Sequence, residues 1–497
     1  MEPALNRHYG HAKNILSVTQ HNQSIQEEQR TGFSRFITAV FDGWSNAGVD
    51  FVVLRNYEGL PHKTTNDIDV LVARDQLKLA EQTLVSVAAH EGYSLVNRAE
   101  FVPVSLHFAN LETADQIHFD LFIDMRWHSF EFVRCADFLG RKIQRANFWI
   151  PHPADEACTN LLGFLIYQGR VRDKYKRGIV SAFRIYANAA QALLAESYGD
   201  ALAQKLVRLA IQEKWADIER MARKLRVTLL VRLVGRHPIK TLAAIATDAA
   251  RFVRRMFQPA GLMVVLLGPD GSGKSTIAKA VLEGLTGTFY TAKSVHYHWK
   301  PKLVQRKAYH AQAVVTNPHG RPPRNLVLSI LFFGLHWAEF VLGSILKIWP
   351  VLFRGGLVLI ERYYHDFFVD QARYRLRVPR VLVELGYLFV KKPDLVLVLD
   401  APVHVLRMRK QEVSEGETER QRRAYIELAT TTKNAVVINA EQQPQQVTAH
   451  AVKAILNHLA ARAQRRAGQY PNAMSPQETT GTATELTPPD QPTGAEG

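Results

Sequence analysis

A nine-residue segment, GPDGSGKST, constrains the fold of this chain more than any other feature. It fits the pattern G-x4-G-K-[ST], follows an apolar run at 263–267 and precedes a predicted helix at 274–284. The glycines let the backbone wrap phosphate groups with its N–H groups inward, and the amino end of the helix adds a positive dipole. Lys274 would reach the β- and γ-phosphates, and the Ser275 hydroxyl would ligate Mg²⁺. The residues predicted to hold a nucleoside triphosphate are Gly268, Asp270, Gly271, Ser272, Gly273, Lys274, Ser275 and Thr276.

Strands alternate with helices after this loop, which indicates a parallel α/β sheet. A chain of 497 residues also exceeds the roughly 250–300 residues at which one core stops growing, so at least two domains are expected. In the first half, predicted helices at 33–47 and 76–90 accompany strands at 51–54, 68–72 and 117–125, before a mostly helical stretch. The predicted divisions are a flexible start at 1–30, an α+β domain at 31–150, a helical extension at 151–235, a basic linker helix at 236–260, a parallel-sheet domain at 261–465 and a disordered tail at 466–497.

The charge and the cysteine content of the chain indicate its partners and its cellular compartment. Lys and Arg number 62 against 46 Asp and Glu, a net charge of +16 that suits anionic partners. Nucleic acid is not expected, because no DNA- or RNA-binding motif accompanies the basic stretch. Two cysteines, a polar start and no apolar leader segment favour a reducing, cytoplasmic location.

Acidic and basic residues gather where the predicted strand at 357–360 ends. Glu361 and Arg362 come first, and Asp366, Asp370 and Arg373 follow within a dozen residues. Ligands of open α/β sheets bind at the carboxyl ends of the strands. Further arginines, including Arg407 and Arg409, flank a polar segment, QEVSEGETER, that is typical of a lid over a transferring phosphoryl group. We expect one or two of these arginines to contact phosphate and the others to lie on a solvated helix face.

Residues 261–463 resemble the thymidylate kinase-like P-loop kinases, which have a nucleoside monophosphate kinase-like fold. The matching parts are GPDGSGKST, ERYY, KKPDLVLVLDAPVHVLRMRK, the helix containing Tyr425 and VVINAEQQPQQV. The resemblance implies ATP- and Mg²⁺-dependent phosphorylation of a nucleoside monophosphate or a related small acceptor. By position, Lys274, Ser275 and Thr276 would bind ATP and Mg²⁺, Arg362 would hold the acceptor phosphate, and Arg407 or Arg409 would act from the lid. Glu361, Tyr363, Asp366 and Arg373 are the other predicted substrate residues.

Two departures from the family pattern leave the acceptor open. The usual Asp-Arg pair is Glu361-Arg362, and the usual Arg-Glu-Pro element is Trp299-Lys300-Pro301. The segments ERYYHDFFVDQARYR and RKQEVSEGETERQRRAY resemble a divergent branch met in bacterial surface-polysaccharide contexts. The acceptor is therefore expected to be dTMP-like or a sugar- or lipid-linked intermediate.

Three carboxylates form a second candidate site in the first half. Alternation places Asp67 and Asp69 on one face of a strand, and Asp120 lies on a later strand within IHFDLFID. Such a group can hold one or two Mg²⁺ ions that activate a nucleophile on a nucleoside triphosphate. An edge strand carrying solvated acids is the alternative.

Residues 51–235 resemble the nucleotidyltransferase-fold family through FVVLRNYEGLP, NDIDVLV and HFDLFIDMRWH. The resemblance implies that Asp67 and Asp69 are the metal-binding pair and Asp120 the third carboxylate. The Gly-Ser that packs the triphosphate in that family is replaced by Leu54-Arg55-Asn56. Nucleotide transfer, nucleotide binding alone and a structural relic all remain open. The chain could thus be a kinase, a nucleotidyltransferase whose kinase-like half senses ATP, or a membrane-associated nucleotide-binding adaptor.

One apolar segment, Leu326 to Leu346, is long enough to span a bilayer. Glu339 lies within it and would be costly at a bilayer centre, so a buried or interfacial helix is favoured. The basic helix near Arg251, Arg254 and Arg255 could add a peripheral membrane contact. A homodimer is left open.

Overall fold

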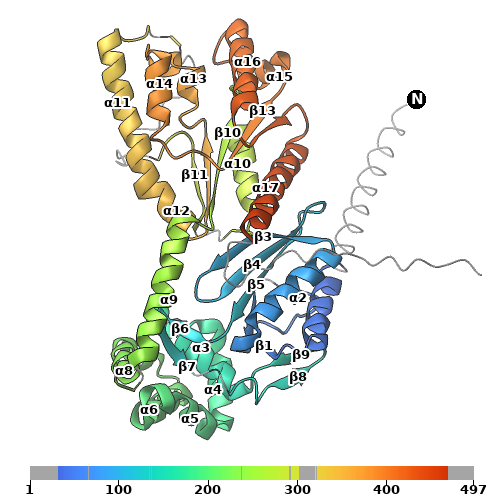
Figure 1. Cartoon of the computed structure of the whole chain (residues 1–497), viewed down its shortest axis with the longest axis vertical. Helices are drawn as coiled ribbons and strands as arrows, with labels where there is room; N and C mark the ends of the chain where they lie inside the picture. Colours follow the sequence, from blue (N-terminus) through green and yellow to red (C-terminus); the bar gives the residue numbers. More distant parts are fainter. Residues whose placement is uncertain are drawn as a thin grey trace, which may run out of the picture.

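The computed structural model describes residues 32–64, 67–133, 135, 137–236, 238–289, 293–301, 319–320 and 322–467. The predicted flexible start at 1–30 lies outside these residues, and so does the predicted tail beyond 467. Two α/β bodies are stacked along the long axis, and a set of helices flanks the lower one (Figure 1).

The upper body is a five-stranded sheet of order β11-β12-β10-β13-β14 with every pair parallel. Its strands are β10 (Leu262–Leu267), β11 (Val295–Tyr297), β12 (Leu357–Glu361), β13 (Leu395–Asp400) and β14 (Ala435–Asn439). The strands β10, β12 and β13 are almost continuously buried, as expected when helices cover both faces of a parallel sheet. The parallel α/β prediction is confirmed, and β11 is an edge strand outside the predicted elements.

Helices cover both faces of this sheet. Even-numbered residues of β10, such as Leu262 and Val264, share a core with α10 (Lys274–Gly284) and α17 (Pro444–Ala467). Odd-numbered residues such as Val265 face the other core, which includes side chains of α11 (Leu326–Gly343) and α14 (Arg380–Tyr387). The remaining elements are α12 (Trp349–Phe353), α13 (Asp366–Val369), the 3₁₀ turn Ala372–Tyr374, α15 (Val403–Arg409) and α16 (Glu415–Thr431).

The lower body contains a mixed sheet of order β1-β2-β5-β4-β3. Its strands are β1 (Phe51–Val53), β2 (Ile68–Val72), β3 (Tyr93–Glu100), β4 (Val104–Asn110) and β5 (Gln116–Phe122). The helix at 32–46 and α2 (Leu77–His90) pack against it through one core that includes Phe36, Trp44 and Phe119. The strand predicted at 117–125 ends at Phe122, because the chain turns there into the hairpin β6 (Met125–Trp127) and β7 (Phe130–Val133). A second hairpin, β8 (Ile143–Arg145) and β9 (Phe148–Ile150), follows.

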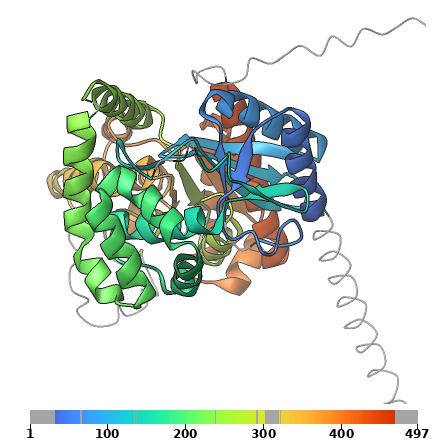
Figure 2. The same ribbon diagram turned by 90° about the horizontal axis from the view of Figure 1, so that it is seen from below.

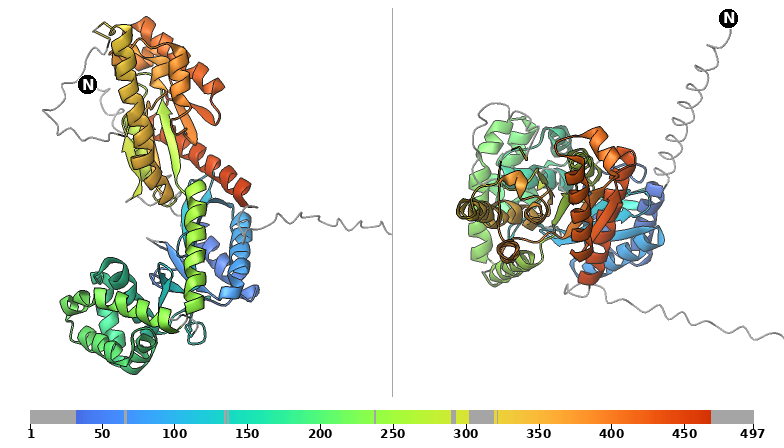
Figure 3. Two further views of the ribbon diagram at one scale, coloured as in Figure 1. Left: turned by 60° about the vertical axis from the view of Figure 1, so that its left-hand side comes forward. Right: turned by 90° about the horizontal axis from the view of Figure 1, so that it is seen from above.

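The helical extension lies beside this sheet and has its own core (Figure 2). Its helices are α3 (Pro153–Gln168), α4 (Asp173–Ile185), α5 (Ala187–Tyr198), α6 (Asp200–Ile211), α7 (Trp215–Arg220) and α8 (Ala222–Arg236). The predicted linker is α9 (Pro238–Phe257), a single helix that runs from the extension to the upper body (Figure 3).

The basic side chains predicted to face a membrane are engaged within the protein. Arg251 pairs with Asp248, and Arg254 pairs with Glu100. Arg255 lies over the rings of Phe101 and Phe353. The exposed side chains of α9 include several apolar ones, among them Ile239, Leu242, Phe252 and Phe257.

The two sheets share an interface. Val96 of β3 and Ala109 of β4 belong to the same core cluster as α10 and α17. Arg462 of α17 is buried and donates to Asn97 Oδ1 of β3 at 3.5 Å, and Asn97 Nδ2 donates to the Ala260 carbonyl oxygen, just before β10, at 3.1 Å. The side chain of Gln116 donates to the Gly284 carbonyl oxygen at the end of α10 (2.6 Å). The lower sheet therefore packs directly on the helix that begins at the glycine-rich loop.

The apolar segment forms one continuous helix, Leu326–Phe353, through a π-helical stretch at Ser344–Ile348. Among the described residues it is the one helix long and apolar enough to cross a membrane, and 22% of its most apolar window is buried. It packs through a narrow stripe that includes Phe333 and Phe340, while Val327 is 76% exposed. Of the two predicted alternatives, the buried helix is therefore wrong, and the interfacial helix stays a prediction.

Candidate active site

The glycine-rich loop joins β10 to α10 at the carboxyl edge of the sheet. Gly268, Gly271 and Gly273 have φ values of 140°, 85° and 85°, which favour glycine. A Cβ at Gly271 would overlap the carbonyl oxygen of Leu406, so the loop needs this residue for space as well. The helix then begins at Lys274, so its free amide groups face the loop. The loop thus has the backbone conformation that the predicted anion cradle requires.

Lys274 is buried beneath the loop. Its Nζ donates to the carbonyl oxygens of Gly268 (2.9 Å) and Pro269 (2.7 Å) and contacts Ser272 Oγ at 3.3 Å. Burial, together with the positive charge of Arg362, lowers the pKa of Lys274 to about 7. A polyanion in the cradle would favour the charged form and give the ammonium group a stronger partner than these carbonyls.

Ser275 and Glu361 form an oxygen-rich pair beside the loop. Ser275 Oγ donates to Glu361 Oε2 at 2.8 Å, and Glu361 is 4% exposed at the end of β12. Burial opposes ionisation of Glu361, but hydrogen bonds from His296 and Ser275 hold its pKa below the usual value. A hydroxyl and an ionised carboxylate are ligands that Mg²⁺ prefers, so the pair fits the Mg²⁺ of a bound nucleotide.

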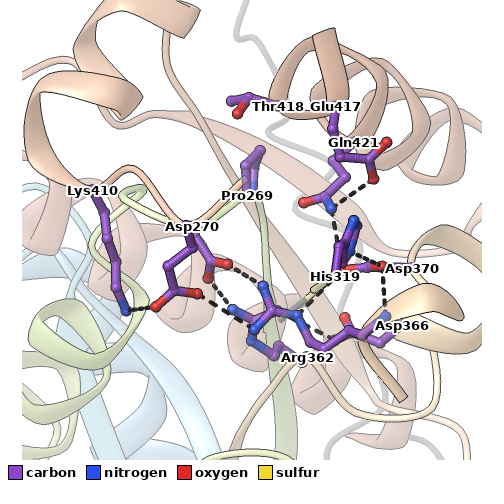
Figure 4. A network of polar contacts seen from close by, with 12 residues as sticks. Pro269, Asp270, His319, Arg362, Asp366, Asp370, Lys410, Glu417, Thr418 and Gln421 are labelled. Atoms are coloured by element: carbon purple, nitrogen blue, oxygen red, sulfur yellow. Dashed lines mark hydrogen bonds and ion pairs between the residues drawn. The ribbon is translucent and has the colours of Figure 1, made fainter. Parts of the chain in front are cut away.

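Two arginines converge on the loop carboxylate Asp270 (Figure 4). Arg362 follows β12 and Arg373 follows α13, and each forms an ion pair with a different oxygen of Asp270. Although burial opposes ionisation, Arg362, Lys274 and Arg373 hold the pKa of Asp270 well below its usual range. Arg362 and Arg373, predicted to act on the acceptor, therefore meet Asp270 of the predicted nucleotide-binding loop.

A buried polar shell fixes the position of Arg362. Asp366 is fully buried, lies 3.5 Å from Arg362 and accepts hydrogen bonds from Tyr374 (2.7 Å) and Tyr425 (2.9 Å). Arg362 itself has φ of 65°, a conformation that non-glycine residues rarely adopt and that is more often found at functional sites. Asp366 thus positions Arg362.

Tyr363 differs from its prediction as a substrate residue. It is fully buried, and its hydroxyl donates to the Lys391 carbonyl oxygen at 2.8 Å and lies 3.3 Å from Ser344 Oγ. The side chain points into the core on the α11 side of the sheet. This position indicates a packing role.

The predicted lid arginines separate into two groups. Arg409 donates to the Ala440 carbonyl oxygen at 2.8 Å and lines a cavity of about 310 Å³ beside the loop. Arg407 donates to the Val413 carbonyl oxygen at 3.0 Å, within the segment itself. The remaining arginines lie on α16, which begins at Glu415 within the predicted lid, and they pair with carboxylates: Arg420 with Glu417, Arg422 with Asp400 and Arg423 with Glu419.

The cavity lined by Arg409 is also lined by Gly273, Thr276 and Gln442. It therefore combines the amino end of α10 with the turn after β14. Its place next to the phosphate cradle suits the base of a nucleotide whose phosphates lie in the loop.

The element Trp299-Lys300-Pro301 contacts the apolar helix α11 and Tyr374, the residue after Arg373. Trp299 stacks on Tyr374 with ring centroids 4.3 Å apart, and Lys300 forms an ion pair with Glu339. Lys300 Nζ also lies 2.8 Å from His336 Nδ1. Glu339 is therefore compensated within an otherwise apolar helix. Sequence reasoning noted this element only as a departure and missed the aromatic stack, which depends on tertiary contacts.

The three carboxylates of the lower body also converge. Oxygen atoms of Asp67, Asp69 and Asp120 lie within 4.8 Å of one another. This proximity follows from the parallel register in which Asp69 lies opposite Asp120. Asp69 accepts from Arg55 Nε at 2.5 Å through Oδ2, whereas its buried Oδ1 has no hydrogen-bond partner among the described residues. Burial raises the pKa of Asp69 to about 6, against the lowering effect of Arg55.

Asp120 lies in a contrasting environment. Its Oδ1 accepts from Ser105 Oγ at 2.5 Å and lies 3.0 Å from His118 Nε2. Burial opposes ionisation, but the hydrogen bond and charge of His118 lower the pKa of Asp120. Two buried carboxylates thus differ in pKa because one has several donors and the other has one.

Comparison with known proteins concerns the upper body. Residues 267–451 match the family model described as thymidylate kinase. The thymidylate kinase of Thermosynechococcus vestitus is 28% identical over 222 residues, which cover 40% of this chain and 89% of that protein. That of Xanthomonas oryzae pv. oryzae is 28% identical over 207 residues, covering 39% and 84%. A solved thymidylate kinase from Ehrlichia chaffeensis aligns at 18% identity with a TM-score of 0.30, covering 39% of this chain and 98% of that one.

The C-terminal half is thus thymidylate kinase-like, and the family match with the curated relatives supports a phosphotransferase. The TM-score of the solved structure is too low to add to this. The comparisons do not support the nucleotidyltransferase-fold prediction for the N-terminal half, which stays a prediction.

Proposed function

We propose that the C-terminal domain transfers the γ-phosphoryl group of ATP to a phosphate of a nucleoside monophosphate or a related small acceptor. The observation that carries the proposal is the pair of arginines, Arg362 and Arg373, held at the phosphate loop by Asp270. A P-loop lysine needs no such partners to bind one triphosphate. Two more cations at the same place suit a second phosphate, and they stabilise charge that spreads over the transferring group.

Each residue has a role in this proposal. The loop amides and Lys274 hold the triphosphate, and Ser275 and Glu361 hold the Mg²⁺, which neutralises charge developing between the phosphates. The base lies in the cavity lined by Arg409 and Thr276. The acceptor phosphate binds Arg362 and Arg373, which exchange part of their contact with Asp270 for it.

The thymidylate kinases that match this chain make dTMP the first acceptor to test. The Trp299–Tyr374 stack lies on the acceptor side, where an aromatic surface can pack against a base. A phosphorylated sugar or a lipid-linked phosphate in surface-polysaccharide metabolism is the rival acceptor, because the Trp299-Lys300-Pro301 element departs from the family pattern.

The test is phosphate transfer from labelled ATP to a panel of dTMP, other nucleoside monophosphates, sugar phosphates and lipid-linked phosphates. Arg362→Ala should raise KM for the acceptor about 10- to 100-fold, since a charge-assisted hydrogen bond contributes about 1.5–3 kcal/mol. KM for ATP should change less. Transfer to no member of the panel, with ATP binding intact, would leave a nucleotide-binding domain without kinase activity.

The second proposal is a divalent cation site at Asp67, Asp69 and Asp120. The specific observation is the buried, unpartnered Asp69 Oδ1 in a group of three carboxylates. A cation there would satisfy this oxygen and relieve the repulsion between like charges. Nucleotidyl transfer, with the kinase-like domain sensing ATP, is the activity that such a site could support. Incubating the whole chain with labelled nucleoside triphosphates and Mn²⁺ in a Lys274→Ala background tests for transfer that does not depend on the P-loop.

The third proposal concerns location. We infer a cytoplasmic protein that contacts an anionic membrane through the exposed apolar side chains of α11 and α9, with the net charge of +16 adding attraction. Leu331 and Leu335 are 59% and 57% exposed on α11. Sedimentation with vesicles of anionic lipid should therefore recover the wild-type chain and lose a Leu331→Glu/Leu335→Glu variant. Equal recovery of both would refute the contact, and so would no recovery of either.

A further inference from the structure

Two histidines, His296 on the edge strand β11 and His298 just after it, lie beside Glu361 near the phosphate loop. In the parallel register of β11 and β12, His296 lies opposite Leu359 and Tyr297 opposite Ile360. Leu359 belongs to the core on the α10 side, and Tyr297 packs on the other core together with Ile360. Because side chains alternate along a strand, His296 points to the α10 side, and His298, just beyond the strand, reaches the same Glu361. That is the side on which Glu361 meets Ser275.

The two imidazoles converge on one carboxylate oxygen. His296 Nε2 lies 2.8 Å and His298 Nδ1 lies 3.0 Å from Glu361 Oε1, with ring centroids 4.7 Å apart. Oε2 of the same carboxylate accepts the hydrogen bond from Ser275. The two oxygens of Glu361 therefore serve different partners, one toward the nucleotide loop and one toward the histidines.

We propose that His296, His298 and Glu361 bind a divalent transition-metal ion such as Zn²⁺. The three candidate ligand atoms already lie within 4.8 Å of one another. Imidazole nitrogen with carboxylate oxygen is a donor set that suits Zn²⁺ and neighbouring metals, whereas Mg²⁺ prefers oxygen ligands alone. Three protein ligands leave coordination positions open, and the 77% exposed side chain of His298 shows that solvent reaches the site.

This site is distinct from the Mg²⁺ position inferred at Ser275 and shares one residue with it. A metal held by the histidines would replace their hydrogen bonds to Glu361 Oε1 and fix the carboxylate while Oε2 stays directed at Ser275. The proposal rests on the geometry of β11 and β12 and does not require the chain to be a kinase.

The experiment is a titration of the full-length chain, freed of any affinity tag and of metal, with Co²⁺ followed by visible absorption, and then competition by Zn²⁺. We expect one tight site from the absorption of the imidazole-bound ion. His298→Ala and His296→Ala should each weaken its binding at least about tenfold, since even residues that only support metal ligands change affinity 10- to 100-fold. His450→Ala, which removes an exposed histidine of α17, should bind as wild type.

Two further variants separate this proposal from the others. Lys274→Ala should keep the Co²⁺ absorption, and so should Asp67→Asn/Asp69→Asn, because neither touches the histidines. If a folded His298→Ala/His296→Ala double variant binds Co²⁺ as tightly as wild type, or if wild type shows no imidazole-bound Co²⁺, the histidines are only hydrogen-bond partners of Glu361 and the proposal is wrong. Loss of kinase activity in Lys274→Ala leaves the metal site untouched, so the two conclusions can fail separately.

Discussion

The phosphate loop and the carboxylate cluster hold charge in opposite ways. The loop presents backbone amides and one lysine, and its conformation is set by three glycines within six residues of one another. The cluster presents carboxylates from β2, its preceding turn and β5, which are brought together only when the strands pair. A site made from contiguous backbone has a recognisable sequence motif, whereas a site assembled from separate strands has only a weak sequence signal. The family match at residues 267–451 includes the first site and not the second.

The two sites are nevertheless connected through α10. Its first turn holds Lys274 and Ser275, and its last carbonyl, from Gly284, accepts from Gln116 of β5. A few residues beyond, the Gly287 carbonyl oxygen lies 3.2 Å from His107 Nδ1. The His107 ring stacks on His118, which contacts Asp120.

The largest expected effect tests the loop. Lys274→Ala should lower the rate of phosphoryl transfer about 10²- to 10³-fold, as removal of one preorganised donor to a developing negative charge does elsewhere. Steady-state kinetics with the acceptor found in the panel measure it. Lys279→Ala, which changes an exposed lysine on the same helix, is the matched control and should keep wild-type turnover. A Lys274→Ala enzyme with wild-type turnover would contradict the kinase proposal.

The next prediction concerns how the free energy of unfolding depends on pH, which differs in sign between a histidine of each region. His365 follows the turn that carries Arg362, is 1% exposed, and burial lowers its pKa from 6.5 to about 4. The folded chain therefore binds this proton less well than the unfolded chain, and stability falls as the pH drops from about 6.5 to 4. The shift corresponds to about 3 kcal/mol.

His118 beside Asp120 behaves in the opposite sense. Burial opposes its charged form, but Asp120 raises its pKa, so its contribution is present in acid and is lost as the pH rises. Denaturant unfolding at several pH values measures both regions. His365→Gln should flatten the loss of stability between pH 6.5 and 4, and the exposed control His450→Gln should not. An unchanged slope in His365→Gln would show that His365 does not stay neutral in the folded chain.

The third prediction tests the carboxylate cluster. Asp67→Asn/Asp69→Asn, made in a Ser275→Ala background that weakens the nucleotide Mg²⁺ site, should reduce Mn²⁺ affinity at least about 100-fold, because two of three charged ligands are lost. Electron paramagnetic resonance of bound Mn²⁺ gives the number of sites. The same Asp substitutions in the wild-type background should leave phosphoryl transfer intact. Equal Mn²⁺ binding with and without the carboxylates would make the cluster a structural relic.

Particular residues show what the sequence could and could not predict. The central strands of the upper sheet and the cradle were predicted because continuous apolar runs and glycine spacing are local signals. Strands β3 and β4 were missed because buried polar side chains interrupt their pattern. Arg98 pairs with Glu81 inside the fold, and Asn97 donates to the Ala260 carbonyl oxygen at the interface. From the sequence alone, such polar residues are predicted to be exposed, because their buried partners are not known.

The convergence of His296 and His298 on Glu361 depends on a parallel register between strands more than 60 residues apart. Alternation alone does not fix that register. Tyr363 was misplaced for a related reason: its neighbour Arg362 suggested a shared site, but the left-handed turn at both residues sends the two side chains to opposite environments.

The smallest expected effect concerns the link between the two regions. Gln116 donates to Gly284 (2.6 Å) and accepts from Thr288 Oγ1 (2.7 Å), so Gln116→Ala removes two contacts across the interface. Each such hydrogen bond contributes about 0.5–1.5 kcal/mol, and we expect a loss of about 1–3 kcal/mol in the free energy of unfolding. Because Val96 and Ala109 share a core with α10, the transition should remain single for the two sheets. Gln204→Ala, an exposed control on α6, should leave stability unchanged.

If Gln116→Ala instead splits the unfolding curve into two transitions, the two sheets unfold as separate cooperative units. The phosphate loop and the carboxylate cluster are then in contact but do not unfold together. If the variant unfolds like wild type, the interface hydrogen bonds add nothing, and α10 does not tie the carboxylate cluster to the phosphate loop.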